Sequence, residues 1–595
     1  ADFKPVSMGR RQSLALALIA SAAIAAAASG LASLLYDWRR RSVRAADLSL
    51  RRQRRRADLA EAKARFVESV KAATERAGLS PAEEAEILAL PTAELVGRLQ
   101  ARTLDHRRVL LAYQRRAIDV DSRTNCAVEF LAPDWAGVDL DGPLAGLPVS
   151  LKDNFCLAGR DSCVGCSALI GRPAEADCSP VAALKALGGV PFVRTAVPQS
   201  MMSVLSSNPI DGTVRHPSAP GRSPGGSSSG EATLVAGGGS PLGLGTDLGG
   251  SIRLPAAWCG CVGFKPTNGR LTSQGFGAAA AGAQRLVPGT WGPLAPDVGG
   301  VALLMSAMCS ARPGYQYRLD PELPPLDWAG DDCDGQRPLV IGYFVDESPH
   351  LFDALPCMRR AVQLAKSALE SRGHRLVAWR LPDAPYFELY LRCVFSDGGR
   401  RLVDLLDGDE VSPAVRHSLD TARTPRWLRR ARARAAAAYG RREAAVWLEA
   451  SLGADADGGG VWHLAQRLAD ARRQFCFAWR QAGLDGLICP AGACPAVHLA
   501  PTSGSFTGAL SFFNLFNTLN CPAGTVPVTR VTAEDLAEAA AAYPAGKSAW
   551  HRSVAAMHDA GSDGLPVSVQ CAALPWRDEA CLRLMAELEA AVARQ

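Results

Sequence analysis

Lysine and aromatic residues are both scarce in this 595-residue chain, whereas arginine is abundant. Aromatic side chains make up 6% of the sequence, and only eight of the 65 basic residues are lysine. Much of the net charge of +6 comes from one N-terminal stretch, so the sequence does not predict a broad nucleic-acid-binding face. Because hydrophobic residues reach 48% and charged residues 21%, the composition excludes disorder, collagen and coiled coil as descriptions of the whole chain.

Regular cysteine spacing and nucleotide-binding motifs are also missing. The 17 cysteines are odd in number and unevenly spaced, which is typical of reduced thiols and not of a disulfide framework. Cys163 and Cys166 form a lone CxxC, and no second pair follows at the distance that a zinc site requires. The chain has no GxxxxGK[ST] motif either. We therefore expect no metal, no cofactor and no nucleic-acid partner.

Near the N-terminus, residues 14–36 carry no charge and are numerous enough to cross a hydrocarbon core of about 30 Å. Arginines crowd the flank that follows, which by the positive-inside tendency places that flank in the cytoplasm. They are Arg39, Arg40, Arg41, Arg44, Arg51, Arg52, Arg54, Arg55 and Arg56. The segment is rich in alanine, so a cleaved signal peptide is the alternative to a retained anchor.

The anchor interpretation divides the chain into four parts. We expect a tail at residues 1–13, a transmembrane helix at 14–36, a basic juxtamembrane and helical region at 37–120, and one large domain at 121–595 on the cytoplasmic side. Small residues recur every four positions within the anchor, which would let two such helices pack closely and favours a dimer. They are Ser21, Ala25, Ser29 and Ser33.

The pattern of apolar and polar residues predicts an α/β fold. Helical periodicity covers residues 57–71, Ser80-Pro81-Ala82-Glu83 is a capping box, and a third helix is expected from Thr92. Short apolar strands at 147–151 and 190–193 then alternate with helical stretches, which is typical of a sheet covered by helices on both faces. Residues 413–450 interleave arginine with Trp427 and Tyr439 and predict a pair of basic amphipathic helices, facing either solvent or a membrane surface.

The residues most indicative of chemistry are serines within two Gly/Ser-rich turns at 223–255. Acyl transfer requires a nucleophile, a base and hydrogen-bond donors for the oxyanion. No histidine pairs convincingly with these serines, but a buried lysine can act as the base because desolvation lowers its pKa. Lys152 directly follows the apolar run 147–151 and is the candidate.

The combination resembles the amidase signature family. The resemblance rests on Gly226-Ser227-Ser228-Ser229-Gly230, on Gly245-Thr246-Asp247-Leu248-Gly249-Gly250-Ser251, and on Lys152 upstream of both. Further segments at 197–201, 264–267, 395–400 and 528–535 look like the membrane-bound animal branch of that family, and the likeness covers nearly the whole chain.

The resemblance implies a twisted mixed β-sheet sandwiched by α-helices and a Ser-Ser-Lys triad. Ser251 would be the nucleophile, Ser227 a bridging serine after a cis peptide bond, and Lys152 the base. The backbone N–H groups of Leu248, Gly249, Gly250 and Ser251 would form the oxyanion hole. Ser228, Asp247 and Arg253 would support the site, with a surface ion pair as the alternative for the last two, and Met201, Thr507, Leu510 and Trp550 would contact the substrate.

The same resemblance implies hydrolysis of fatty-acid amides to a free fatty acid and an amine. Expected substrates are N-acylethanolamines such as anandamide and primary amides such as oleamide. We expect a homodimer in contact with membrane lipid in endomembranes such as the endoplasmic reticulum. The alternatives are an amidase for small polar amides, an amidotransferase-like subunit, and a catalytically silent lipid-binding module.

Overall fold

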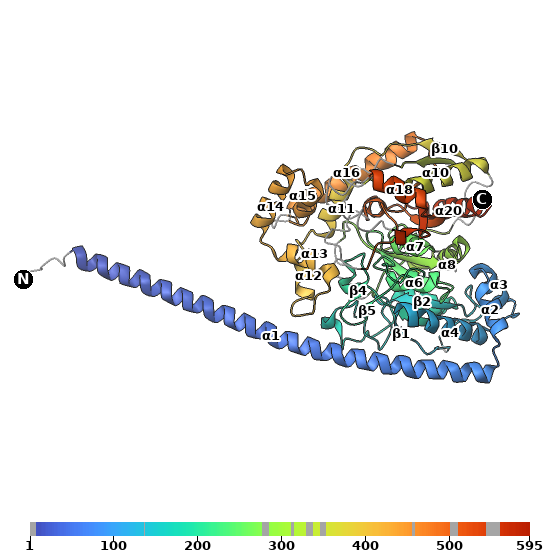
Figure 1. Ribbon diagram of the computed structural model, residues 1–595, viewed down its shortest axis with the longest axis horizontal. Helices are drawn as coiled ribbons and strands as arrows, with labels where there is room; N and C mark the ends of the chain where they lie inside the picture. The colour runs from blue at the N-terminus through green and yellow to red at the C-terminus, as the bar shows by residue number, and fades with distance from the viewer. Residues whose placement is uncertain are drawn as a thin grey trace, which may run out of the picture.

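The computed structural model of the chain describes residues 8–135, 137–276, 285–310, 314–328, 337–345, 353–454, 459–499, 510–542 and 560–594. Within those ranges the side chains of residues 8–35, 37, 442, 443 and 560 are not described. The chain starts with one long helix, α1 (Met8–Ala77), whose first half projects away from a large α/β body while its second half lies along that body (Figure 1).

Ion pairs hold the second half of α1 against the body. Lys63 Nζ lies 3.0 Å from Asp121 Oδ2, and Arg52 Nη1 lies 3.2 Å from Asp409 Oδ1. Where side chains are described, no helix combines the length and the apolar character needed to cross a bilayer. The anchor expected at 14–36 lies almost entirely outside the described side chains, so it stays a prediction.

Three helices follow α1: α2 (Pro81–Ala89), α3 (Thr92–Gln100) and the longer α4 (His106–Thr124). The N-cap part of the predicted capping box is confirmed, because the Glu83 N–H donates to Ser80 Oγ at 3.2 Å. The single helix expected from Thr92 is two helices instead. Arg102 adopts a left-handed conformation (φ 56°) after α3, and the Asp105 carboxylate starts α4 by accepting from the backbone N–H groups of Arg107 and Arg108.

A mixed sheet of eleven strands forms the core of the described body, in the order β1-β3-β2-β6-β8-β7-β12-β13-β11-β9-β10. Strand β2 is parallel to both β3 and β6, and β9 is parallel to β10 and β11, whereas the central pairs are antiparallel. The strands are β1 (Ala127–Phe130), β2 (Pro148–Lys152), β3 (Val190–Thr195), β6 (Gly243–Asp247), β7 (Val262–Lys265), β8 (Thr290–Ala295), β9 (Val340–Tyr343), β10 (Arg375–Ala378), β11 (Gly486–Pro490), β12 (Ala523–Arg530) and β13 (Pro566–Ala572). A separate hairpin pairs β4 (Ser207–Asn208) with β5 (Gly212–Thr213).

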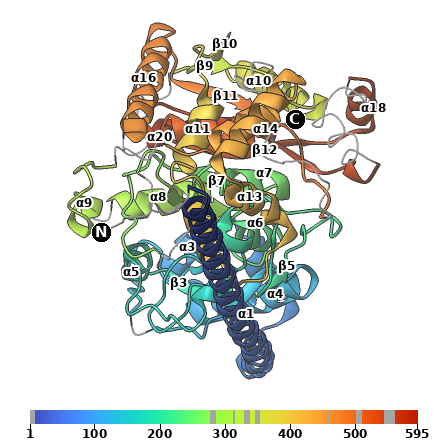
Figure 2. The ribbon, with the colours of Figure 1, turned by 90° about the vertical axis from the view of Figure 1, so that its left-hand side faces the viewer.

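Helices pack around this sheet, as the two ribbon views show (Figures 1 and 2). Every residue of β2, β3, β8, β11 and β13 is buried, which requires both faces of those strands to be covered. The helices beyond α4 are α5 (Ser179–Ala186), α6 (Ser229–Ala236), α7 (Arg253–Cys259), α8 (Val298–Ser310), α9 (Tyr315–Leu319), α10 (Pro356–Ser371), α11 (Tyr386–Val394), α12 (Arg400–Leu405), α13 (Pro413–Arg423), α14 (Arg426–Ala438), α15 (Arg442–Ala450), α16 (Gly459–Gln481), α17 (Ser511–Thr518), α18 (Ala533–Ala542) and α20 (Asp578–Val592).

The basic region 413–450 forms three helices, α13 to α15. The prediction of two amphipathic helices in this region was therefore wrong. Pro425 separates α13 from α14, and Gly440, with φ 69°, separates α14 from α15. Trp427 and Tyr439 are 70% and 85% exposed. These helices lie on the side of the body toward which the first half of α1 projects (Figure 1).

Candidate active site

Sheet order brings the sequence-predicted residues together. Lys152 is the last residue of β2, and Thr246 and Asp247 end the neighbouring strand β6. Because β2 and β6 run parallel, their carboxyl ends lie at the same edge of the sheet. Ser227 precedes α6, and Ser251 lies in the short loop between β6 and α7.

Lys152 is fully buried and surrounded by hydroxyl groups. Its Nζ lies 2.8 Å from Ser227 Oγ, 2.9 Å from Ser228 Oγ and 2.9 Å from Thr246 Oγ1. Burial lowers the pKa of Lys152 to about 7, although the nearby carboxylates of Asp247 and Glu231 oppose this shift. A large fraction of the amine is therefore neutral at neutral pH and able to accept a proton.

Ser227 and Ser251 line the same cavity, which has a volume of about 760 Å³. The peptide bond between Gly226 and Ser227 is cis. A backbone hydrogen bond of 3.0 Å from the Ser228 N–H to the Ser251 carbonyl holds the two serine-bearing loops together. Among the described residues no hydrogen bond joins the Ser227 and Ser251 hydroxyls, and such catalytic contacts often tighten only when substrate is bound.

The loop after β6 contains four backbone N–H groups that the sequence predicted as oxyanion donors, and one of them already has an acceptor. The Gly250 N–H donates to Asp247 Oδ1 at 2.8 Å, so Asp247 shapes the turn. In the described part of the chain, the N–H groups of Leu248, Gly249 and Ser251 have no protein acceptor. The N–H groups of Leu248, Gly249 and Ser251 therefore stay candidates for the predicted oxyanion hole, whereas the Gly250 N–H is already bonded to Asp247.

Asp247 and Arg253 form a fully buried ion pair, which excludes a surface pair. The guanidinium meets both carboxylate oxygens at 3.0 Å, from Nε to Oδ2 and from Nη2 to Oδ1. Burial by itself would raise the pKa of Asp247, but Arg253 holds it below its usual range. Asn517 Oδ1 and Gln570 Oε1, which lie far away in the sequence, accept from Arg253 at 2.6 Å each, and the Phe513 carbonyl accepts from Arg253 Nη1 at 2.9 Å.

Two of the four residues expected to contact the substrate lie near Ser251, and the other two are not described. Met201 lines the cavity with Ser251, and Leu510 lies against Gly250 on the loop that carries Ser251. Thr507 and Trp550 lie outside the described residues. Leu248, Leu271, Phe276 and Leu323 add apolar surface to the cavity. Its charged lining residues include Arg285, Arg401, Asp320 and Glu322.

Sequence reasoning missed two polar residues around Lys152. Thr246 contributes both its hydroxyl and its carbonyl oxygen, the latter 3.2 Å from Lys152 Nζ, although it lies inside the motif that carries Ser251. Glu231 is fully buried, accepts hydrogen bonds from the hydroxyls of Ser150 and Thr195, and has a pKa raised by burial to about 8. Its place in the first turn after the Gly/Ser-rich motif was the only signal.

Metal ligands do not cluster in the described part of the chain: no group of three or more His, Cys, Asp or Glu side chains is arranged to hold an ion. The chemistry available at the site is that of a serine hydroxyl, a neutral amine and oriented backbone amides.

Comparison with known proteins identifies the family. The Amidase family model matches residues 108–582, so the chain belongs to the amidase family and is an enzyme of that family. It is 39% identical to "Fatty-acid amide hydrolase 1" of Sus scrofa over 94% of each chain. It is 33% identical to "Fatty acid amide hydrolase 1" of Caenorhabditis elegans over 81% of this chain and 84% of the relative.

A solved structure named "Fatty acid amide hydrolase" has the same fold. It superposes with a TM-score of 0.73 at 24% identity and covers 91% of this chain and 95% of its own. The expected α/β amidase-signature fold, with its large mixed sheet and covering helices, is thereby confirmed for the body of the molecule.

Proposed function

We propose that this chain hydrolyses fatty-acid amides through an acyl-enzyme on Ser251. The observation that carries the proposal is the fully buried Lys152, whose Nζ lies 2.8 Å from Ser227 Oγ in a cavity wall shared with Ser251. A lysine with a pKa near 7 is a base poised at neutral pH, which is what activation of a serine requires.

Acylation begins with two proton transfers. Neutral Lys152 takes the proton of the Ser227 hydroxyl, Ser227 takes the proton of the Ser251 hydroxyl, and Ser251 Oγ attacks the amide carbonyl carbon. The negative charge that develops on the carbonyl oxygen is stabilised by the free N–H groups of the loop, those of Leu248, Gly249 and Ser251.

Collapse of the tetrahedral intermediate breaks the C–N bond. The proton held by Lys152 returns through Ser227 to the amide nitrogen, so a neutral amine or ammonia leaves and the acyl group stays on Ser251. Water, deprotonated by the same relay, then attacks the ester carbonyl, releases the fatty acid and restores the Ser251 hydroxyl. Ser228 and Thr246 support the relay by binding the Lys152 amine on its other sides.

The substrate class follows from the cavity and from the relatives. Apolar side chains such as Met201, Leu271 and Phe276 suit an acyl chain beside the nucleophile. Two relatives that match over most of their length are named fatty-acid amide hydrolases. We propose N-acylethanolamines such as anandamide and primary amides such as oleamide as substrates.

Membrane attachment is the second part of the proposal. An anchor at 14–36 would leave the catalytic domain on the cytoplasmic side of endomembranes such as the endoplasmic reticulum. The exposed rings of Trp38 and Trp427 and the arginines of α14 support contact with the bilayer surface, where aromatic and basic side chains are favoured. The homodimer expected from the anchor helix belongs to the same proposal.

Active-site labelling tests the function. Intact-mass detection of a lipid-like fluorophosphonate adduct is expected for the wild type and not for Ser251→Ala, with protection by oleamide and none by acetamide. Protection by acetamide alone would favour the small-amide alternative, and failure of the folded wild type to label would favour the silent module. Labelling of Ser251→Ala at the wild-type rate would contradict the nucleophile.

A further inference from the structure

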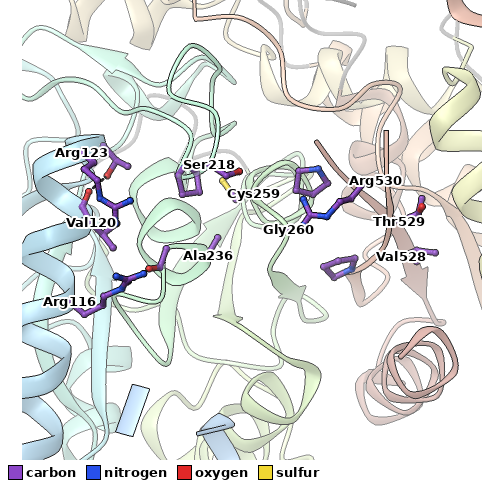
Figure 3. A pocket seen from close by; sticks show the side chains of 15 residues that line it. Arg116, Val120, Arg123, Ser218, Ala236, Cys259, Gly260, Val528, Thr529 and Arg530 are labelled. Atoms are coloured by element: carbon purple, nitrogen blue, oxygen red, sulfur yellow. Dashed lines mark hydrogen bonds between the residues drawn. The ribbon is translucent and has the colours of Figure 1, made fainter. Parts of the chain in front are cut away.

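A second cavity, of about 530 Å³, lies away from the catalytic serines and shares no lining residue with the cavity of Ser251. Helix α4 forms one wall, the end of β12 forms the opposite wall, and the last residues of α6 and α7 lie between them (Figure 3). Its volume is within the range of about 300 to 1,000 Å³ that is usual for small-molecule sites. Nothing in the proposed hydrolysis uses this cavity.

The charged groups that line the cavity are all arginines: Arg116 and Arg123 on α4, and Arg530 at the end of β12. Arg116 and Arg123 are two helical turns apart and therefore lie on the same face of α4. A single carboxylate, Asp119 Oδ2, lies 3.2 Å from Arg116 Nη1 and 2.8 Å from Arg123 Nη2. One carboxylate between two guanidinium groups leaves that wall positively charged.

Each of these three guanidinium groups donates to a backbone carbonyl without using all of its donors, and the Arg123 Nε bond to the Asp119 carbonyl is the longest at 3.4 Å. Arg116 Nε donates to the Gly237 carbonyl at 3.1 Å, which satisfies an acceptor at the end of α6. Arg530 Nη1 donates to the Gly564 carbonyl at 2.8 Å on the other wall. In the described part of the chain, Nη2 of Arg116, Nη1 of Arg123 and both Nε and Nη2 of Arg530 have no protein acceptor.

The rest of the lining is neutral and small. Ser218 and Thr529 contribute hydroxyl groups, and Val120 and Pro566 contribute short apolar surfaces. The Thr124 hydroxyl also lies in the lining, but it donates to the Val120 carbonyl at 2.7 Å. Oriented guanidinium groups on two opposite walls, with spare donors and no acidic lining residue, match the geometry by which arginine binds phosphate and carboxylate groups.

We propose that this cavity binds a small soluble polyanion that carries phosphate or carboxylate groups. The three arginines bind its acidic groups from both walls, and the hydroxyls of Ser218 and Thr529 bind the remaining oxygen atoms. The site is independent of the Ser251 cavity, and its occupant is a ligand and not a substrate of the triad.

Binding of two probes to the full-length chain in neutral detergent tests the proposal. Inorganic tripolyphosphate represents phosphate ligands and citrate represents carboxylate ligands, and isothermal titration calorimetry at low ionic strength measures their affinities. The variants are Arg123→Gln and Arg530→Gln, one for each wall, because these side chains are exposed and their loss leaves the core intact. The control is Arg98→Gln, at a partly exposed arginine of α3 that pairs with Glu86 and Glu94 outside the cavity.

We expect at least one probe to bind the wild type, each cavity variant to weaken that binding about tenfold or more, and Arg98→Gln to change it less than about twofold. Preference for tripolyphosphate or for citrate then identifies the natural ligand as a phosphate or a carboxylate. The absence of binding by both probes would overturn the proposal. An equal loss in Arg98→Gln would also overturn it, because the attraction would then be the general one of a basic protein for polyanions.

Discussion

The hydroxyl of Tyr390 fills the space that a side chain at Gly249 would need. A Cβ atom on Gly249 would lie 2.0 Å from Tyr390 Oη, and one on Gly250 would lie 2.6 Å from the Cβ of Phe513. Tyr390 belongs to α11 and Phe513 to α17. Two helices from the second half of the chain therefore pack against the loop that leads to Ser251. Glycine is required at both positions because only a bare backbone fits there.

Gly249→Ala is expected to lower kcat for oleamide about a hundredfold. The new methyl group must displace the loop that carries the proposed oxyanion donors, and loss of one such donor typically lowers kcat by about a hundredfold. Release of ammonia measures the effect. Adding Tyr390→Leu, which removes the ring atoms in contact with the new methyl group, should restore part of the lost kcat. Gly221→Ala is the control, since a Cβ there meets no atom within 4 Å. Wild-type kcat in Gly249→Ala, or no recovery in the double variant, would contradict the steric relationship.

The pH dependence of hydrolysis should follow the Lys152 amine. Because burial lowers the pKa of Lys152 to about 7, the amine loses its proton as the pH rises through that value. We expect kcat/KM to rise about tenfold per pH unit below 7 and to level off above it. A pH profile of kcat/KM for the wild type measures this.

Lys152→Ala should lose most activity at neutral pH, with a deficit that shrinks at high pH because hydroxide partly replaces the internal base. Lys185→Ala, which removes an amine paired with Asp177 outside the site, should keep the wild-type profile. An unchanged rate at neutral pH in Lys152→Ala would refute its role as the base.

Asp247→Asn should destabilise the protein by about 3 to 5 kcal/mol, because it leaves the fully buried Arg253 without its counter-charge. The midpoint of thermal unfolding, followed by tryptophan fluorescence, reports the change. Asp470→Asn breaks the exposed pair with Arg473 and should cost less than about 1 kcal/mol. Equal effects of the two substitutions would mean that the buried pair contributes no more than a surface pair.

Trp427 should lie at the bilayer surface if α14 contacts the membrane. Brominated phospholipid in vesicles quenches the fluorescence of tryptophan side chains that contact the bilayer. We therefore expect the Trp427→Phe variant of the chain to show less tryptophan quenching than the wild type. Trp576→Phe is the matched control, because Trp576 is also exposed, at 39%, but lies just before α20 and outside the basic helices α13 to α15. Unchanged quenching in Trp427→Phe would place α14 in solvent, which is the alternative that the sequence left open.

Some parts of the fold were predictable because neighbouring residues alone determine them. Ser80 and Glu83 cap α2, and the apolar run before Lys152 forms β2, since capping and strand formation depend on residues a few positions apart. The break between α3 and α4 was missed because Arg102 adopts a conformation that its residue type disfavours. The third helix within 413–450 was missed although Pro425 and Gly440 mark its boundaries.

The candidate site also combines features that the sequence predicts with features that depend on the folded structure. Motif and spacing singled out Lys152, Ser227 and Ser251, and the structure places the lysine amine on Ser227 in a cavity that Ser251 also lines. The sequence by itself determined the family, the residue types of the site and their order along the chain. Only the tertiary structure decided that the Tyr390 hydroxyl packs against Gly249 and that Gln570 accepts a hydrogen bond from Arg253. It also decided that three arginines from α4 and β12 line one cavity. These contacts join residues far apart in the chain, so they depend on the order of strands in the sheet and on helix packing, which no local pattern encodes.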